Sequence, residues 1–322
     1  MYVIKVRSVE DAYVRGREIM DLYGIREESR NGPVMVAPWP VTTVYEDPTD
    51  RVLLNRARKS NHAFHINEAI WMLSGSNDAR WLDQFIHNFS SRYAREDGTM
   101  DGAYGFRWRK HFGKDQLEEV IYTLGEQNNS RRAVIAMHDP IKDLNADTKD
   151  QPCNTHIYLR VRAGALEMTV LCRSNDIIWG AYGANAVHFS VLQEYLAAAI
   201  GVKVGTMYQV SNNWHTYVDT WRATDLPNSS EYWPNYKPVP LVNHPYSFIR
   251  ECEIWTNPAW GDHIYLNTWF VDTLYPIRVA FNHAKNKNFR NAHEVADNIK
   301  DFKWRKGMIR WIEDREAKWS NT

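Results

Sequence analysis

Several features that would place a protein in a familiar class are missing from this sequence of 322 residues. Lys and Arg, 39 in all, balance 39 Asp and Glu, so no global charge attracts a polymeric nucleic acid. The three cysteines, Cys153, Cys172 and Cys252, show no paired spacing, which disfavours a disulfide framework and a zinc site. No apolar run approaches the roughly 20 residues of a membrane-spanning helix, and the N-terminus lacks the apolar core of a signal peptide. We therefore expect a soluble, cytoplasmic protein without a metal.

Hydrophobic periodicity predicts a mixed α and β chain with no Pro-, Gly- or Ser-rich linker. Alternation predicts strands at residues 2–9, 34–45, 130–135, 156–162, 166–172 and 264–279. Helical spacing predicts helices at residues 9–23, 61–73, 115–126, 184–200, 291–299 and 302–318. Residues 139–150 and the proline-rich part that contains Pro227, Pro234, Pro238, Pro240 and Pro245 are predicted to be loops and turns.

The residues with chemical potential are concentrated between positions 151 and 219. Gln151-Pro152-Cys153 places a thiol before two predicted strands, and Arg173-Ser174-Asn175-Asp176 follows the second strand. His215 and Tyr217 lie two apart, so on a strand they share one face. A single cysteine is usually a small buried hydrophobe, but here it precedes groups suited to binding an anion and a sugar. The pattern indicates a nucleophilic thiol with a phosphate-bearing substrate.

These motifs resemble the thymidylate synthase superfamily, in their order and spacing, over residues 30–219. The resemblance implies an α/β (α+β) fold, in which helices flank a large mixed, mostly antiparallel sheet and two subunits pack through the sheet face. It also implies 5,10-methylenetetrahydrofolate as co-substrate and no metal. We expect one catalytic domain over residues 1–322, of which residues 220–322 form a divergent C-terminal part. If a phage encodes the protein, it would act in the host cytoplasm.

The resemblance also assigns a role to individual residues. It implies that Cys153 is the nucleophile, that Glu68 moves protons through water, and that Tyr104 orders this water. The residues it implies for the nucleotide and its phosphate are Arg30, Arg173, Ser174, Ala184 or Asn185, His215, Tyr217, and the pair Arg131 and Arg132 from the partner subunit. Asp176 and Gly180 are implied for the folate. Arg173 is expected to lower the pKa of the Cys153 thiol.

Three departures from the family pattern bear on the product. Ser90 and Tyr93 stand where tryptophans are usual, and the chain ends in polar residues instead of an apolar lid. Water would then reach an exocyclic methylene intermediate, which favours a hydroxymethyl product over a methyl product. Counting from Cys153 without a gap places Ala184 where the family has a base-reading asparagine, and Asn185 follows it. Such an alanine resembles enzymes that hydroxymethylate cytidine monophosphate, whereas a shift of one residue would restore a uracil reader.

The sequence thus predicts a transferase that hydroxymethylates C5 of a pyrimidine nucleoside monophosphate, with CMP or dCMP favoured. The alternatives are a dUMP hydroxymethylase, a thymidylate synthase that methylates dUMP, and a nucleotide-binding homologue without turnover. Release of tritium from C5 in the presence of folate would separate the enzymes from the silent homologue.

Overall fold

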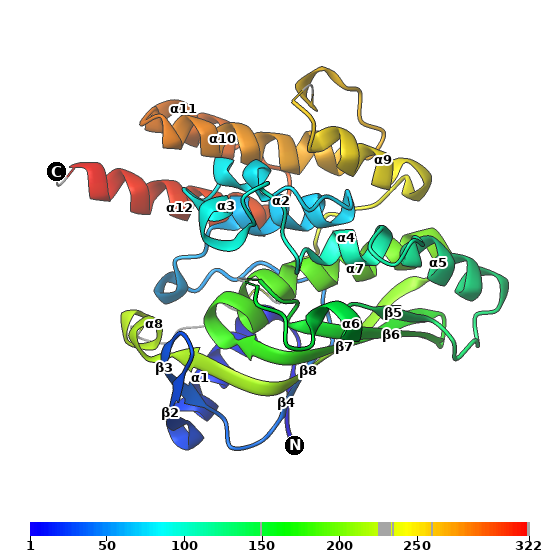
Figure 1. The fold of residues 1–322 in the computed structure, drawn as a ribbon. Helices are drawn as coiled ribbons and strands as arrows, with labels where there is room; N and C mark the ends of the chain where they lie inside the picture. The colour runs from blue at the N-terminus through cyan, green and yellow to red at the C-terminus, as the bar shows by residue number, and fades with distance from the viewer. Residues whose placement is uncertain (149, 225–232, 234, 259, 321–322) are drawn as a thin grey trace.

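The structure is a computed structural model that describes residues 1–148, 150–224, 233, 235–258 and 260–320 (Figure 1). The described residues contain an eight-stranded sheet in which β1-β4-β8-β7-β6-β5 are neighbours in that order and the hairpin β2-β3 joins β8. The strands are β1 (Tyr2–Val6), β2 (Ile25–Ser29), β3 (Gly32–Val36), β4 (Val41–Tyr45), β5 (Val134–Ala136), β6 (Asn154–Arg162), β7 (Ala165–Asp176) and β8 (Lys203–Tyr217). Only β1-β4 and β7-β8 pair in parallel, so the sheet is mixed and mostly antiparallel, as predicted.

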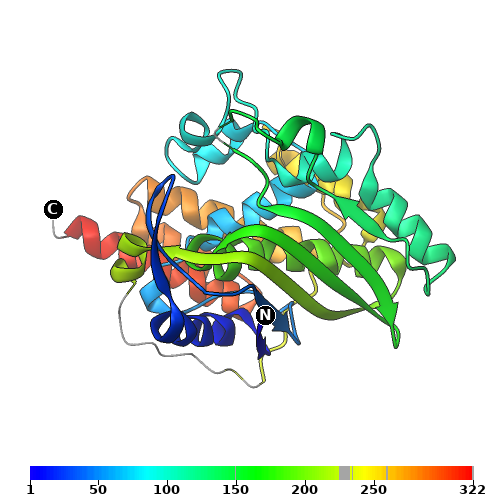
Figure 2. The same cartoon turned by 60° about the horizontal axis from the view of Figure 1, so that its bottom comes forward.

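One face of the sheet is covered by helices and the other is largely bare, as Figure 2 shows from below. In β7 the inward side chains Met168 and Val170 are fully buried, while those between them are half-buried. A layer of helices lies between the sheet and the C-terminal helices (Figure 1). It contains α2 (His62–Leu73), α3 (Phe89–Tyr93), α4 (Tyr104–Arg109), α5 (Gln116–Glu126) and α7 (Asn185–Ile200), with the short helices η1 (Arg56–Arg58) and η2 (Ala79–Gln84). Helix α1 (Val9–Tyr23) packs against β1 beside the β2-β3 hairpin.

Helix α2 is buried along its whole length, because α7 packs on one side of it and the C-terminal helices on the other (Figure 1). Its start is fixed by Asn61, whose side chain accepts a hydrogen bond from the Phe64 N–H and so caps the helix. This burial leaves the polar side chains of α2 facing other side chains instead of bulk solvent. Glu68, near the middle of α2, is therefore placed inside the protein.

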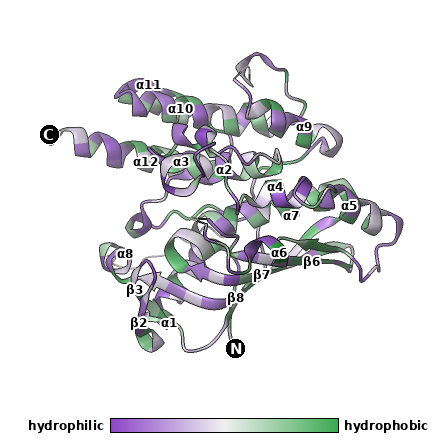
Figure 3. Ribbon diagram, viewed as in Figure 1, coloured by the Kyte–Doolittle hydropathy of each residue, from purple (hydrophilic) through white to green (hydrophobic). Residues whose placement is uncertain are grey.

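The C-terminal part forms a further helical layer over α2. Its helices are α9 (Pro245–Trp255), η4 (Trp260–Asp262), η5 (Phe270–Leu274), α10 (Tyr275–Lys285), α11 (Phe289–Ala296) and α12 (Phe302–Ser320). Trp255 Nε1 donates to Asn67 Oδ1 of α2 at 2.8 Å, and Lys303 Nζ lies 2.6 Å from the Asp50 carboxylate. Figure 3 shows hydrophilic residues along α11 and the outer end of α12. The layer is thus bonded to the rest of the chain through buried polar contacts as well as apolar packing.

Some predictions for individual elements are wrong. The predicted strand at residues 264–279 is helical, because η5 and α10 occupy most of it. The predicted loop at 139–150 contains the one-turn helix α6 (Pro140–Asp143), which Asp139 caps. Helix α8 (Val218–Ala223) follows β8, and Pro245 begins α9 instead of a turn. The turns predicted at Pro227 and Pro234 lie outside the described residues.

Candidate active site

Cys153 is the residue immediately before β6, which begins at Asn154. Its carbonyl oxygen accepts a hydrogen bond from the Arg173 N–H at 2.9 Å, so the thiol and the end of β7 are neighbours. The Arg173 guanidinium donates to Pro152 O at 3.1 Å, which holds it beside the cysteine loop. Burial raises the pKa of the Cys153 thiol; Arg173 opposes this rise, while Asp150 and Asp176 add to it. The expected effect of Arg173 is therefore present, but burial outweighs it in this structure.

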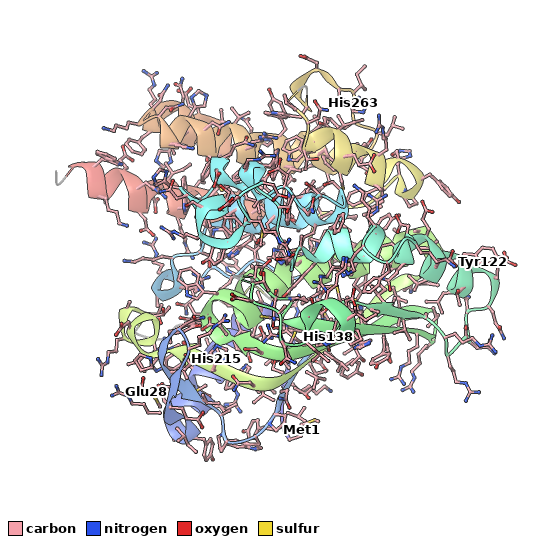
Figure 4. All side chains as sticks on the ribbon, viewed as in Figure 1. Met1, Glu28, Tyr122, His138, His215 and His263 are labelled. Atoms are coloured by element: carbon pink, nitrogen blue, oxygen red, sulfur yellow. The ribbon has the colours of Figure 1, made fainter. Side chains whose placement is uncertain are left out.

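The residues predicted to bind phosphate and sugar converge on a hollow of about 400 Å³ beside the β2-β3 hairpin. The hollow is lined by the predicted residues Arg30, Arg173, Ser174, His215 and Tyr217, and also by Glu28 and Asn213. Figure 4 shows His215 on β8 next to the hairpin that carries Glu28. β-Sheet pairing explains the convergence, because Val34 of the hairpin is paired with Tyr217, and Asp176 at the end of β7 is paired with His215.

Arg131 and Arg132 do not reach this hollow. Both are exposed and precede β5, which forms the opposite edge of the sheet. Within one subunit they are therefore separate from the other predicted phosphate ligands.

The segment that leads into α7 contains a π-helical turn, η3 (Ile177–Ala184), that periodicity did not predict. The Asn185 N–H donates to Gly180 O, five residues earlier, where an α-helix would bond four residues back. The turn kinks at Gly183, where a Cβ atom would lie 2.6 Å from Ile178 O. A π turn holds one residue more than an α turn, so α-helical spacing does not describe the start of this segment.

Asn185 is the buried polar residue at the start of α7. Its Nδ2 donates to Asn175 Oδ1 at 3.1 Å, and Asn175 Nδ2 donates to Ser211 Oγ at 3.0 Å. We call these three side chains the amide relay. Because the Asn175 oxygen faces Asn185, the Asn185 amide turns its nitrogen to that side and its oxygen Oδ1 away. Gly180 packs against the relay, where a Cβ atom would lie 2.6 Å from Asn175 Oδ1.

Acidic and aromatic groups surround the thiol on its helical side. Tyr104 begins α4 and stacks on Phe189 with ring centroids 6.0 Å apart. Burial raises the pKa of the Tyr104 hydroxyl, and the nearby Cys153 raises it further. Asp150 accepts a hydrogen bond from the Gly102 N–H at 2.8 Å, and burial raises the pKa of its carboxyl to about 6. Glu68 contributes to that rise, which places it within electrostatic reach of the same cluster.

Asp176 and the turn after it form another, partly exposed side of the candidate site. Asp176 Oδ1 accepts from the Trp179 N–H at 2.5 Å, whereas its buried Oδ2 has no hydrogen-bond partner among the described residues. Burial raises the pKa of this carboxyl. Arg58 donates from Nε to Ile178 O at 2.8 Å and lies over the Trp179 ring, and burial lowers its pKa to about 10. An unpaired buried oxygen of this kind suits a ligand that donates hydrogen bonds.

The two departures that bear on water access lie in ordinary structural contacts. Ser90 donates from its hydroxyl to Asp83 Oδ2 at 2.6 Å, and its N–H bonds the other oxygen of the same carboxylate. The polar residues 313–320 belong to α12, which packs against α2, α10 and α11.

Sequence reasoning missed Asp150, Asn175 and Arg58 as members of this cluster. Only Asn175 had a visible signal, since it lies inside the Arg173-Ser174-Asn175-Asp176 motif. The cysteines are free, as expected. Within the described ranges, no group of three or more His, Cys, Asp or Glu side chains is arranged to hold a metal ion, and none of the helices combines the length and apolarity that a bilayer crossing needs.

Comparison with known proteins identifies the family of this chain. A sequence model of the thymidylate synthase family matches residues 17–234. The chain is 38% identical over 337 residues to the deoxyuridylate hydroxymethyltransferase of Pseudomonas phage M6, covering 98% of this chain and 95% of that protein. It is 33% identical over 196 residues to the enzyme of the same name from Bacillus phage SP01, covering 57% of this chain and 51% of that protein. It is 30% identical over 201 residues to the deoxyuridylate hydroxymethyltransferase of Delftia phage PhiW-14, covering 59% of this chain and 56% of that protein.

Fold, site and relatives together define a transferase of one-carbon units that uses methylenetetrahydrofolate as co-substrate. The chain belongs to the thymidylate synthase family, as the sequence motifs predicted. Its substrates are accordingly a nucleoside monophosphate and a folate.

Proposed function

We propose that this protein hydroxymethylates C5 of deoxyuridine monophosphate, with methylenetetrahydrofolate as the carbon donor. The observation that carries the choice of base is the π turn before Asn185. If the π turn holds one residue more than the corresponding turn of the family, Asn185 takes the place of the family's base-reading asparagine and Ala184 belongs to the turn. The names of the three phage relatives support the same substrate. This replaces the cytosine nucleotide that the ungapped count favoured.

The amide relay supports uracil over cytosine. Its hydrogen bonds turn Asn185 Nδ2 towards Asn175 and leave Asn185 Oδ1 on the other side, where it could accept a hydrogen bond from a base. Uracil presents an N3–H donor that such an oxygen accepts, and its O4 accepts from the remaining Asn185 N–H. Cytosine presents an acceptor at N3, which would face the oxygen without a proton between them. The relay thus favours one amide orientation and, through it, one base.

In the proposed reaction the Cys153 thiolate adds to C6 of the base, which makes C5 nucleophilic. The folate supplies the methylene carbon that C5 attacks. Loss of the C5 proton and of the folate leaves an exocyclic methylene that is electrophilic. Arg30, Arg173 and Ser174 would hold the phosphate, since guanidinium groups bind phosphate oxygens in bidentate geometry. His215 and Tyr217 would contact the sugar.

The hydroxymethyl product requires that water reaches this methylene carbon. Ser90 bonds Asp83, and α12 packs into the C-terminal layer. Neither is placed as an apolar cover, which supports attack by water over hydride transfer.

We also propose that two subunits pack through the bare face of the sheet. This face carries Tyr158, which is 44% exposed, and a hollow of about 470 Å³ that Met1, Tyr208 and Val210 help to line. Exposed aromatic and aliphatic side chains on a sheet face are typical of an interface. A two-fold axis there would let Arg131 and Arg132 reach the phosphate of the partner. Tyr158→Glu should give a monomer by light scattering; a dimer that survives this charge would argue against the interface.

The decisive experiment is mass spectrometry of products after incubation with methylenetetrahydrofolate and, separately, dUMP, dCMP, UMP and CMP. Gain of CH2O on dUMP is the expected result. The same gain on a cytosine nucleotide would reverse the base assignment, and gain of CH2 on dUMP would indicate methylation. No product with any nucleotide, and no tritium release from C5, would leave a silent homologue. Cys153→Ser is the matched control, because it changes one atom of the nucleophile.

A further inference from the structure

His188 is a buried titratable residue that the proposed reaction does not yet use. It lies on α7 and is 4% exposed, against the face of α2 that carries Glu68. His188 Nε2 lies 2.9 Å from Glu68 Oε2, and both side chains are almost completely enclosed. The N–H does not point at this oxygen, and a modest rotation of either side chain would bring the two atoms into line.

Neither ring nitrogen of His188 has a hydrogen-bond partner among the described residues. His65 on α2 is an ionisable group within electrostatic reach of this ring, and Arg58 and His62 act in turn on His65. A buried imidazole without hydrogen bonds costs about 1–3 kcal/mol, and an apolar side chain would fill the same space without that cost. Packing alone therefore does not explain a histidine at this position.

The neighbour of His188 is placed to affect chemistry at the thiol. Glu68 acts electrostatically on Asp150, and Asp150 acts on Cys153, so a chain of nearby charges leads from α7 to the nucleophile. His188 lies beside the first member of that chain, with Nε2 2.9 Å from Glu68 Oε2. An effect of His188 on the reaction can therefore pass through Glu68.

We propose that His188 is a positioning residue that holds Glu68 Oε2, so that the free oxygen of this carboxylate takes the proton from the water that attacks the exocyclic methylene. This inference rests on the proposed function. The water oxygen bonds to the methylene carbon, and the electron pair of the exocyclic double bond moves into the ring onto O4. That pair then reforms the C5–C6 double bond and expels the Cys153 thiolate. No oxidant or reductant is needed, because the water supplies the hydroxyl group and its proton remains with Glu68 until release.

The test uses a thiol that competes with water for the same carbon. Full-length enzyme is incubated with dUMP tritiated at C5, methylenetetrahydrofolate and a fixed concentration of 2-mercaptoethanol. Tritium release reports all steps up to loss of the C5 proton. The ratio of thioether to hydroxymethyl nucleotide reports how the intermediate is partitioned. This ratio does not depend on the fraction of protein that is folded.

His188→Gln and His188→Asn should keep tritium release near the wild-type rate and raise the thioether ratio roughly tenfold or more, since general base catalysis is worth at least that much. His65→Gln is the matched control, because it removes an equally buried imidazole from α2 without removing the one beside Glu68. Its ratio should equal that of the wild type.

An unchanged ratio in both His188 variants would overturn the inference. An equally large rise of the thioether ratio in the His65 control would also overturn it. The same holds if tritium release falls in step with product in the His188 variants. Failure of both His188 variants to fold would overturn it too, because it would assign His188 to packing. If the wild-type enzyme forms only methylated nucleotide, the proposed function itself has failed, and this is seen before any variant is examined.

Discussion

The buried ion pair between Lys303 and Asp50 provides a quantitative test of how the C-terminal layer is joined to the rest of the protein. Lys303 on α12 lies 2.6 Å from Asp50, and the two side chains are 3% and 4% exposed. Lys303→Met would leave the carboxylate enclosed without its cation, which costs about 3–5 kcal/mol. With an entropy of unfolding near 2.1 cal/mol/K per residue, 322 residues give a fall in Tm of roughly 4–7 °C.

The pH dependence of this loss has a definite sign. Burial raises the pKa of Asp50 above its ordinary value, and Lys303 opposes the rise. Without the lysine the pKa would rise further, so the folded variant would hold a proton that the unfolded chain releases. Its stability should therefore fall as the pH rises from about 4 towards neutrality, and the difference from wild type should be largest at pH 7.

Denaturant unfolding at pH 5 and pH 7 would measure both effects. Lys300→Met is the matched control, because Lys300 pairs with Asp272 at the surface, and such a pair is worth less than about 1 kcal/mol. Adding Asp50→Leu to Lys303→Met should recover most of the loss, since no buried charge remains. A loss below about 1 kcal/mol at pH 7, or separate unfolding transitions for the C-terminal layer, would refute the view that residues 1–322 form one cooperative domain.

Three further predictions concern the site. Cys153→Ser should abolish product formation while calorimetric dUMP binding persists; turnover in this variant would exclude the thiol as nucleophile. Alkylation of Cys153 by iodoacetamide should reach half its maximal rate at a lower pH in Asp150→Asn than in the wild type, because the carboxylate raises the thiol pKa. In Arg173→Met the midpoint should lie at a higher pH than in the wild type, because the guanidinium lowers the thiol pKa. Identical midpoints would contradict both assignments. Asn175→Leu frees the Asn185 amide to turn, so the preference for dUMP over dCMP in kcat/KM should fall about tenfold; an unchanged preference would disconnect the relay from base selection.

Local signals explain which elements could be predicted from the sequence. Helix α2 begins where its cap Asn61 predicts, and α5 begins after Asp115, whose side chain accepts from two N–H groups of the first turn. The region 264–279 was misread because its aromatic and β-branched residues favour strands in isolation. In the fold, Phe270 and Trp269 are buried against other helices, and packing decides the structure.

The site was predictable where its residues share one motif and unpredictable where they meet across elements. Cys153 and Arg173 come together because β6 and β7 are adjacent, and the spacing of the motif already carried that information. His188 and Glu68 meet because α7 packs on α2, which periodicity does not encode. The π turn was not predicted either, because helical spacing assumes one pitch and this turn holds an additional residue.

Gly180 belongs to the turn after Asp176 and also packs against the amide relay. The sequence assigned it to the folate, since a glycine lets a ligand approach the backbone. In the structure its missing Cβ also makes room for the Asn175 and Asn185 amides, and its carbonyl oxygen accepts the π-type bond from the Asn185 N–H. A side chain here would displace the relay before any folate is bound. The glycine therefore fixes the position of Asn185, whether or not a folate is bound beside it.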